Sequence, residues 1–106
     1  MTDREFLELA AKAAGELTPD WYGNDAYFDG VLQRWNPLTD DGDALRLAVK
    51  LDFRIDIDNQ LSMAAVYANS SYNIDVMVET DDNNDTYAAT RRAIVRAAAA
   101  IGRAVE

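Results

Sequence analysis

Two short segments rich in aspartate carry the side chains of this sequence that are best suited to bind a metal ion. They are residues 40–43, DDGD, and residues 81–85, DDNND. A calcium-binding loop between two helices needs a glycine at its sixth position and a glutamate at its twelfth. The first segment has leucine at both positions, and the second has Thr86 and Arg92. We therefore expect no metal site in either segment.

Both segments are better explained as the starts of helices. Asp40 as an N-cap places Asp43 at the third helical position, where a carboxylate can complete a capping box. Asp85 is expected to cap a final helix in the same way. At the N-terminus, Thr2 and Glu5 have capping-box spacing ahead of an amphipathic segment. The two aspartate-rich segments and the N-terminus are thus expected to be the starts of helices and not metal or catalytic sites.

The residue types that most enzymes use for catalysis are missing or scattered. The chain has no histidine and no cysteine, so a serine–histidine or cysteine–histidine nucleophile cannot be built. Its five glycines form neither a phosphate-binding loop nor a dinucleotide fingerprint. Aspartate and glutamate can act as general acid and base, but no pair stands in a recognisable setting. We expect a protein that is not an enzyme and that uses no cofactor.

Length and charge restrict the class of protein further. A chain of 106 residues fits one domain, residues 1–106. Its 19 acidic residues against 10 basic ones give a formal net charge of −9, which disfavours direct binding to a nucleic-acid backbone. No apolar run is long enough to span a membrane, and the N-terminus lacks the features of a signal peptide. We expect a cytoplasmic protein with no membrane partner.

Three segments have the pattern of β-strands. They are residues 52–58, 61–69 and 72–80, and the short polar connections between them predict an antiparallel meander. With the three helices, the expected fold is α/β (α+β), a layered sandwich in which the helices pack on this meander. The expected order of elements is α-(loop)-α-β-β-β-α.

Residues 18–37 are harder to assign. They contain two prolines, two glycines and half of the ten aromatic residues of the chain. We expect irregular chain here, with a short helix around residues 25–33. The aromatic rings could either anchor one end of the core or line a pocket, and the sequence leaves both interpretations open.

Strict alternation places a set of acidic residues on one face of the predicted sheet. These residues are Asp52, Asp56, Asp58, Asp75 and Glu79. Like charges on one sheet face destabilise it modestly. We therefore expect either that arginines from a covering helix neutralise this face, or that it binds a partner.

The final helix combines an apolar stripe with a basic one. Tyr87, Ile94, Ala98, Ile101 and Val105 are the expected core positions, and Arg92, Arg96 and Arg103 lie together on the opposite side. These arginines could neutralise the protein's own carboxylates, or could form an anion site or an oligomer contact. A ligand site would combine them with Trp21, Tyr22 and Trp35.

Two segments resemble a known protein family. Residues 21–51, WYGNDAYFDGVLQRWNPLTDDGDALRLAVKL, and residues 87–104, YAATRRAIVRAAAAIGRA, are similar to small bacteriophage proteins with the phage ABA sandwich domain. The resemblance implies a phage or prophage protein with a layered α/β fold. It supplies no catalytic motif, so no active-site residue is carried over.

One role and two alternatives follow from these features. The expected role is a non-enzymatic phage accessory protein that inhibits a host defence system, of anti-CRISPR or anti-nuclease type. It would bind a nucleic-acid-binding host protein through an acidic, nucleic-acid-mimicking surface. The alternatives are an oligomeric ligand-binding module that sequesters a nucleotide-like signal, and a virion assembly protein. The open edge of a three-stranded sheet also allows a homodimer.

Overall fold

The computed structural model describes residues 2–15, 20–22, 25–27, 34–68, 77–81 and 85–104. The elements in chain order are α1 (Asp3–Ala13), β1 (Asp20–Tyr22), β2 (Asp25–Tyr27), β3 (Arg34–Trp35), α2 (Asp41–Lys50), β4 (Arg54–Asp58), β5 (Met63–Tyr67), β6 (Met77–Asp81) and α3 (Thr86–Ala104). None of the helices among these residues is both long and apolar enough to cross a membrane.

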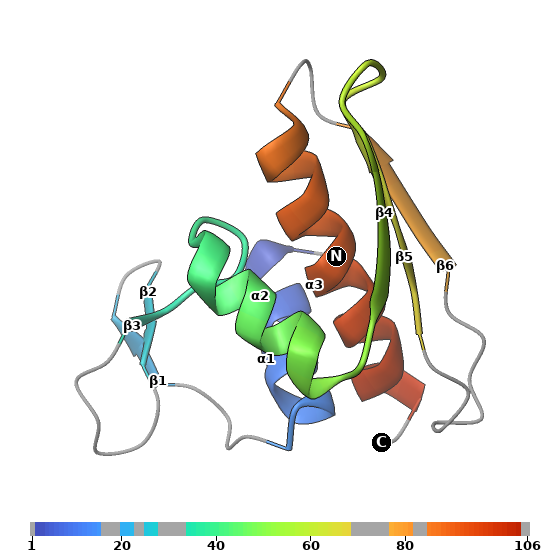
Figure 1. The fold of residues 1–106 in the computed structure, drawn as a ribbon. Coiled ribbons are helices and arrows are strands. Elements are labelled where there is room, and N and C mark those ends of the chain that lie inside the picture. The colour runs from blue at the N-terminus through green and yellow to red at the C-terminus, as the bar shows by residue number, and fades with distance from the viewer. Residues whose placement is uncertain are drawn as a thin grey trace.

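Helix α3 is the central element of the fold. One side of α3 packs against the sheet formed by β4, β5 and β6, and α1 and α2 pack on its other side (Figure 1). The predicted α+β sandwich, with three helices and a three-stranded antiparallel meander, is confirmed. The helices do not form a single layer, however, because α1 and α2 pack mainly on α3 rather than on the sheet.

The larger sheet turns its apolar face toward α3. In the register of the meander, Val66 of β5 pairs with Ile55 of β4 and with Val78 of β6. Val66 and Ala64 are buried, and Ile55 packs at the margin of the same core. Two strands are shorter than predicted, because β4 begins at Arg54 and β5 spans only Met63–Tyr67. Residues 69–76, which include the start of the third predicted strand, lie outside the described part of the chain.

Small side chains allow α3 to be covered on most of its surface. Its buried residues are Ala89, Ala93, Ile94, Val95, Ala97, Ala98, Ala99, Ile101 and Gly102. Because alanine adds only a methyl group, neighbouring elements can approach the helix backbone from several directions. Alanine also has the highest helix propensity of all residues. The same composition therefore favours the helix and permits layers on both sides of it.

Helices α1 and α3 approach each other closely at Gly102 of α3. A Cβ atom added to Gly102 would collide with the backbone carbonyl oxygen of Leu9 in α1. Backbone atoms inside a helix cannot move aside without moving the helix. Glycine is therefore required here by the distance between two helices and not by a turn.

The predicted helix starts are confirmed. The Thr2 hydroxyl accepts a hydrogen bond from the Glu5 N–H (3.2 Å), the Asp40 carboxylate accepts one from the Asp43 N–H (2.8 Å), and the Asp85 carboxylate accepts one from the Ala88 N–H (3.0 Å). Each cap satisfies a backbone donor that the first turn of a helix leaves without a partner. The DDGD segment is the start of α2.

A second, small sheet occupies part of the segment that was predicted to be irregular. Strands β1, β2 and β3 pair antiparallel in that order. The predicted short helix around residues 25–33 is wrong for residues 25–27, which form β2, and residues 28–33 lie outside the described ranges. Trp21 of β1 attaches this sheet to α1, because its indole N–H donates to the Glu8 carboxylate at 3.0 Å.

Three large apolar side chains of α2 and α3 are exposed, and one of them, Tyr87, was predicted to be a core residue. Leu45 and Val49 of α2 are 60% and 72% exposed, and Tyr87 in the first turn of α3 is 73% exposed. Leu45 and Tyr87 border a groove of about 460 Å³ that lies between α2, α3 and β4. The apolar residues of both helices have helical spacing, but Leu45 and Tyr87 face a groove instead of a packed neighbour.

Gly102→Ala is expected to lower the free energy of unfolding by roughly 1–3 kcal/mol, because α1 must move away from α3 to admit the methyl group. Urea denaturation followed by circular dichroism measures the change. Gly42→Ala in α2 is the matched control, since its methyl group would meet only the ends of the Asp40 and Arg46 side chains. This control should be neutral or stabilising by up to about 1 kcal/mol. Equal effects of the two substitutions would contradict the close helix contact.

Candidate functional site

The outer face of the β4–β5–β6 sheet, opposite the face that α3 covers, is the candidate site. Two rows of paired residues cross it: Asp56, Ala65 and Glu79 form one row, and Asp58, Met63 and Asp81 form the next. Residues paired across antiparallel strands lie on the same face. Acidic residues thus occupy both edge strands, about 7 Å apart along a strand and about 10 Å apart across the sheet.

The predicted acidic residues are only partly collected on this face. Asp56 and Asp58 are exposed in β4, and Glu79 lies in β6 at the register position expected for it. Asp52 lies in the turn before β4, with a φ of 57°, and so is not part of the strand. Asp75 is outside the described residues. Asp81 was missed, although it continues the alternation of residues 77 and 79.

A shallow hollow of about 310 Å³ lies on this face. Asp56 and Asp58 border it together with Met63 and Ala65, so that carboxylates stand beside an apolar floor. An arginine or lysine side chain has a matching form, with an apolar stem and a cationic end. The hollow is therefore suited to a basic side chain from a partner.

Both carboxylates of β4 have partners within the chain. Asp58 accepts hydrogen bonds from the backbone N–H groups of Gln60 (2.9 Å) and Leu61 (3.1 Å), which holds the turn between β4 and β5. The Asp56 carboxylate lies 3.7 Å from the guanidinium of Arg54. Exposed ion pairs of this kind are worth about 0–1 kcal/mol, so a basic partner can replace Arg54 at small cost.

The described contacts of the predicted arginine stripe of α3 are with α1 and not with Asp56 or Asp58 of the acidic sheet face. Arg92 lies 3.8 Å from the Asp3 carboxylate, and the Arg96 guanidinium lies 5.7 Å from the centre of the Phe6 ring, so both engage α1. Arg103 is exposed in the last turn of α3. Because α3 packs on the inner face of the sheet, it leaves Asp56 and Asp58 of the outer face exposed.

The aromatic residues predicted as ligand contacts anchor the small sheet. Trp21 and Trp35 both pack against the core, and the Arg4 guanidinium covers the Trp21 ring at 4.6 Å. Tyr22 lies in β1, and its side chain is outside the described part. The described contacts of Trp21 are therefore with α1 and not with the arginines of α3.

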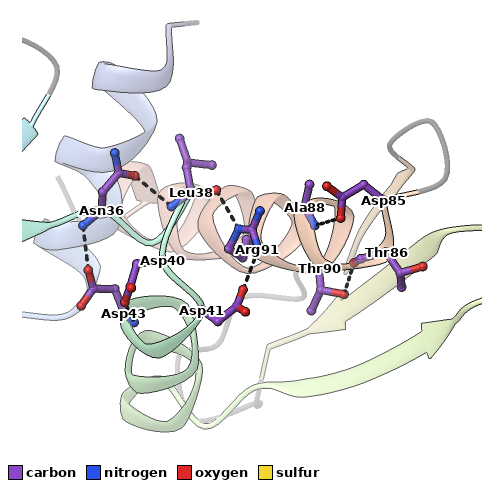
Figure 2. A network of polar contacts seen from close by, with 10 residues as sticks. All are labelled: Asn36, Leu38, Asp40, Asp41, Asp43, Asp85, Thr86, Ala88, Thr90 and Arg91. Atoms are coloured by element: carbon purple, nitrogen blue, oxygen red, sulfur yellow. Dashed lines mark hydrogen bonds and ion pairs between the residues drawn. The ribbon is translucent and has the colours of Figure 1, made fainter.

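Arg91, which no sequence pattern singles out, ties α3 to the chain that leads into α2 (Figure 2). Its Nε–H donates to the carbonyl oxygen of Leu38 at 2.9 Å, and its Nη1 lies 2.6 Å from Oδ1 of Asp41. The Arg91 side chain is only 18% exposed. A planar guanidinium makes the two contacts from two different nitrogens held in a fixed fork, whereas an ammonium group would have to donate to both acceptors from one nitrogen.

The remaining acids of the DDGD segment are also engaged by protein groups. Asp43 is buried and accepts hydrogen bonds from the Asn36 N–H (2.9 Å) and from Arg46 (2.6 Å). Among the residues that the structure describes, no three acidic side chains are placed to hold one metal ion. Helix capping and ion pairing thus account for these aspartates without a cation.

Arg91→Ala is expected to destabilise the fold by about 1–3 kcal/mol, because it leaves the Leu38 carbonyl oxygen without its donor. Arg91→Lys should recover only part of this loss, since lysine cannot reproduce the two-pronged contact. Urea denaturation checks the order. Arg92→Ala is the control, because its longer contact with Asp3 is exposed and should be worth about 0–1 kcal/mol. An Arg92→Ala effect as large as that of Arg91→Ala would contradict the assignment.

Comparisons with known proteins give no relative for this chain. No family model, no curated protein and no solved structure matches it. The resemblance to the phage ABA sandwich family therefore stays a prediction from the sequence. No relative assigns this chain an activity, a ligand or a partner.

Proposed function

We propose that this chain is a non-enzymatic phage accessory protein that inhibits a host defence system of anti-CRISPR or anti-nuclease type. It binds a nucleic-acid-binding host protein and acts in the host cytoplasm. The observation that carries the proposal is the outer face of the β4–β5–β6 sheet, where acidic residues stand in two successive rows. This face imitates the repeated negative charge of nucleic acid.

Charge supports a basic partner surface. The net charge of −9 favours attraction over a long range to a groove that has evolved to bind phosphates. Electrostatic complementarity of this kind raises the association rate and weakens with salt. Asp56 and Asp58 beside the hollow then accept basic side chains that would otherwise contact phosphate groups.

The chain's chemistry supports action by contact rather than by turnover. Histidine and cysteine are absent from the sequence. The aspartates of the DDGD segment are already engaged in capping and ion pairs. What the chain offers a partner is its surface, and occupation of a binding groove requires nothing more.

Neutralisation of two acids of this face should weaken inhibition. The variant Asp58→Asn with Glu79→Gln keeps the hydrogen-bond acceptor that holds the β4–β5 turn, but removes two negative charges. DNA cleavage by a panel of CRISPR effector complexes and restriction nucleases is measured at rising protein concentration. We expect at least one enzyme to be inhibited, with an inhibition constant about tenfold higher for the variant, as two lost charge contacts predict.

The matched control is Asp3→Asn with Glu5→Gln on α1. It removes the same charge from another surface, and glutamine preserves the capping box. This control should inhibit as the unmodified protein does, and inhibition should weaken as salt is added. Equal inhibition by both double variants, or no inhibition of any enzyme in the panel, would contradict the proposal.

Cyclic nucleotides are expected to leave the melting temperature unchanged, because Trp21 already contacts Glu8, and Arg92 and Arg96 contact Asp3 and Phe6. A ligand that binds only the folded state must stabilise it. Thermal unfolding with and without each nucleotide measures this. A rise in melting temperature that grows with ligand concentration would favour a ligand-binding module instead.

A further inference from the structure

We propose that two copies of this chain associate through the outer edge of β4 and join their sheets into one continuous sheet. The partner is a second copy of the chain, and the two β4 strands run antiparallel, with Ile55 of each copy opposite Ile55 of the other. This dimer does not depend on the inhibitory function proposed above. It follows from the edge strand, from the exposed apolar side chains beside it and from the charge pattern of β4.

The edge of β4 is open to pairing. Strand β5 pairs with one side of β4, and no other described strand pairs with the opposite side. Such an edge presents unpaired N–H and C=O groups, and monomeric proteins protect it with proline, bulges or inward-pointing charges. The segment Arg54–Asp58 has a regular register with β5, no proline, and apolar residues at its inward positions. It lacks these protective devices, and the charged side chains that can also protect an edge, Arg54 and Asp56, are complementary between two antiparallel copies.

Apolar side chains stand exposed beside this edge. Ile57 of β4 is 55% exposed and lines the groove with Leu45 of α2, which is 60% exposed. Val49, one helical turn after Leu45, is 72% exposed. One pair of edge strands makes only a small contact, so a stable dimer needs additional apolar area. These side chains, which are more than half exposed in their own copy, supply it along the inner side of the joined sheet.

The charges of β4 are complementary to themselves in one register. Residues opposite each other in an antiparallel pair lie on the same face. With Ile55 on the two-fold axis, Arg54 of each copy lies opposite Asp56 of the other, which forms two pairs of opposite charge on the outer face. On the inner face, the Ile55 side chains of the two copies lie opposite each other. Within β4, both faces are therefore matched.

Other registers are opposed by charge or by the pleat. A register centred on Asp56 places this carboxylate against its own copy, although it also sets Arg54 opposite Asp58 twice. One centred on Ile57 places Asp56 opposite Asp58 twice. A shift by one residue sets the charged face of one copy against the apolar face of the other. Among the registers that pair residues of β4, the one centred on Ile55 alone combines attractive pairs with no pair of like charges.

Charge reversal tests the dimer and its register together. Arg54 and Asp56 have exposed side chains, so Arg54→Asp and Asp56→Arg should both fold. Each substitution alone turns two attractive contacts into repulsive ones, and should weaken association at least about tenfold in sedimentation equilibrium. The double variant Arg54→Asp with Asp56→Arg should associate as the unmodified chain does. A mixture of the two single variants should form a heterodimer, because every contact between them is then attractive.

The outcomes are distinct. Arg34→Asp, on the small sheet, makes the same change in charge and should leave association unaltered. Leu45→Lys should weaken association while the circular dichroism spectrum is retained. A chain that stays monomeric across the concentration series would overturn the proposal. Association that is insensitive to the β4 or Leu45 substitutions, or single variants that fail to combine on mixing, would overturn it too.

The dimer and the inhibitory function can fail separately. The double charge-swapped variant restores the dimer but changes Asp56, which also borders the hollow, so it is used for sedimentation alone. Sedimentation therefore reports on the edge of β4, whereas DNA cleavage assays with the Asp58→Asn and Glu79→Gln variant report on the acidic face.

Discussion

Packing of α3 between two layers is the constraint on which the remaining structure depends. One surface of this helix supports the β4–β5–β6 sheet, and the other supports α1 and α2. Two layers can pack closely on opposite sides of one helix only if the side chains of that helix are small. This explains the run of alanines in α3 and the glycine at the contact with Leu9. The position of α3 also decides which face of the sheet is covered, and so leaves the charged face outside.

Local signals in the sequence predicted most of the framework. Capping residues such as Thr2, Asp40 and Asp85 act within one helical turn, and the alternation of β4 acts within one strand, so both can be read without knowledge of the neighbours. The small sheet was missed because its strands have two or three residues, too few for a period to be recognised. The apolar alternation of the strands indicated which residues share the covered face, and the position of α3 shows that this face is the one it packs against.

Features that depend on distant elements escaped prediction for a physical reason. Leu45, Val49 and Tyr87 satisfy helical periodicity, but periodicity does not reveal whether a neighbour or a groove faces the stripe. Arg91 looks like any other arginine of α3, because its partner is a backbone carbonyl group 53 residues earlier in the chain. The acidic face was predicted only in part. The alternation of side chains along a strand identified Asp56, Asp58 and Glu79. Asp52 precedes the observed start of β4, and Asp81 belongs to the face because β6 extends to it.

The location of the central helix in the chain has a consequence for biosynthesis. Helix α3 comes after every other described element, yet α1, α2 and the larger sheet all bury their apolar surfaces against it. While the ribosome is still translating the segment that will become α3, the earlier elements have no common surface on which to assemble. We therefore expect α1, α2 and the larger sheet to assemble only after α3 has left the ribosome. Until then, their apolar faces stay exposed.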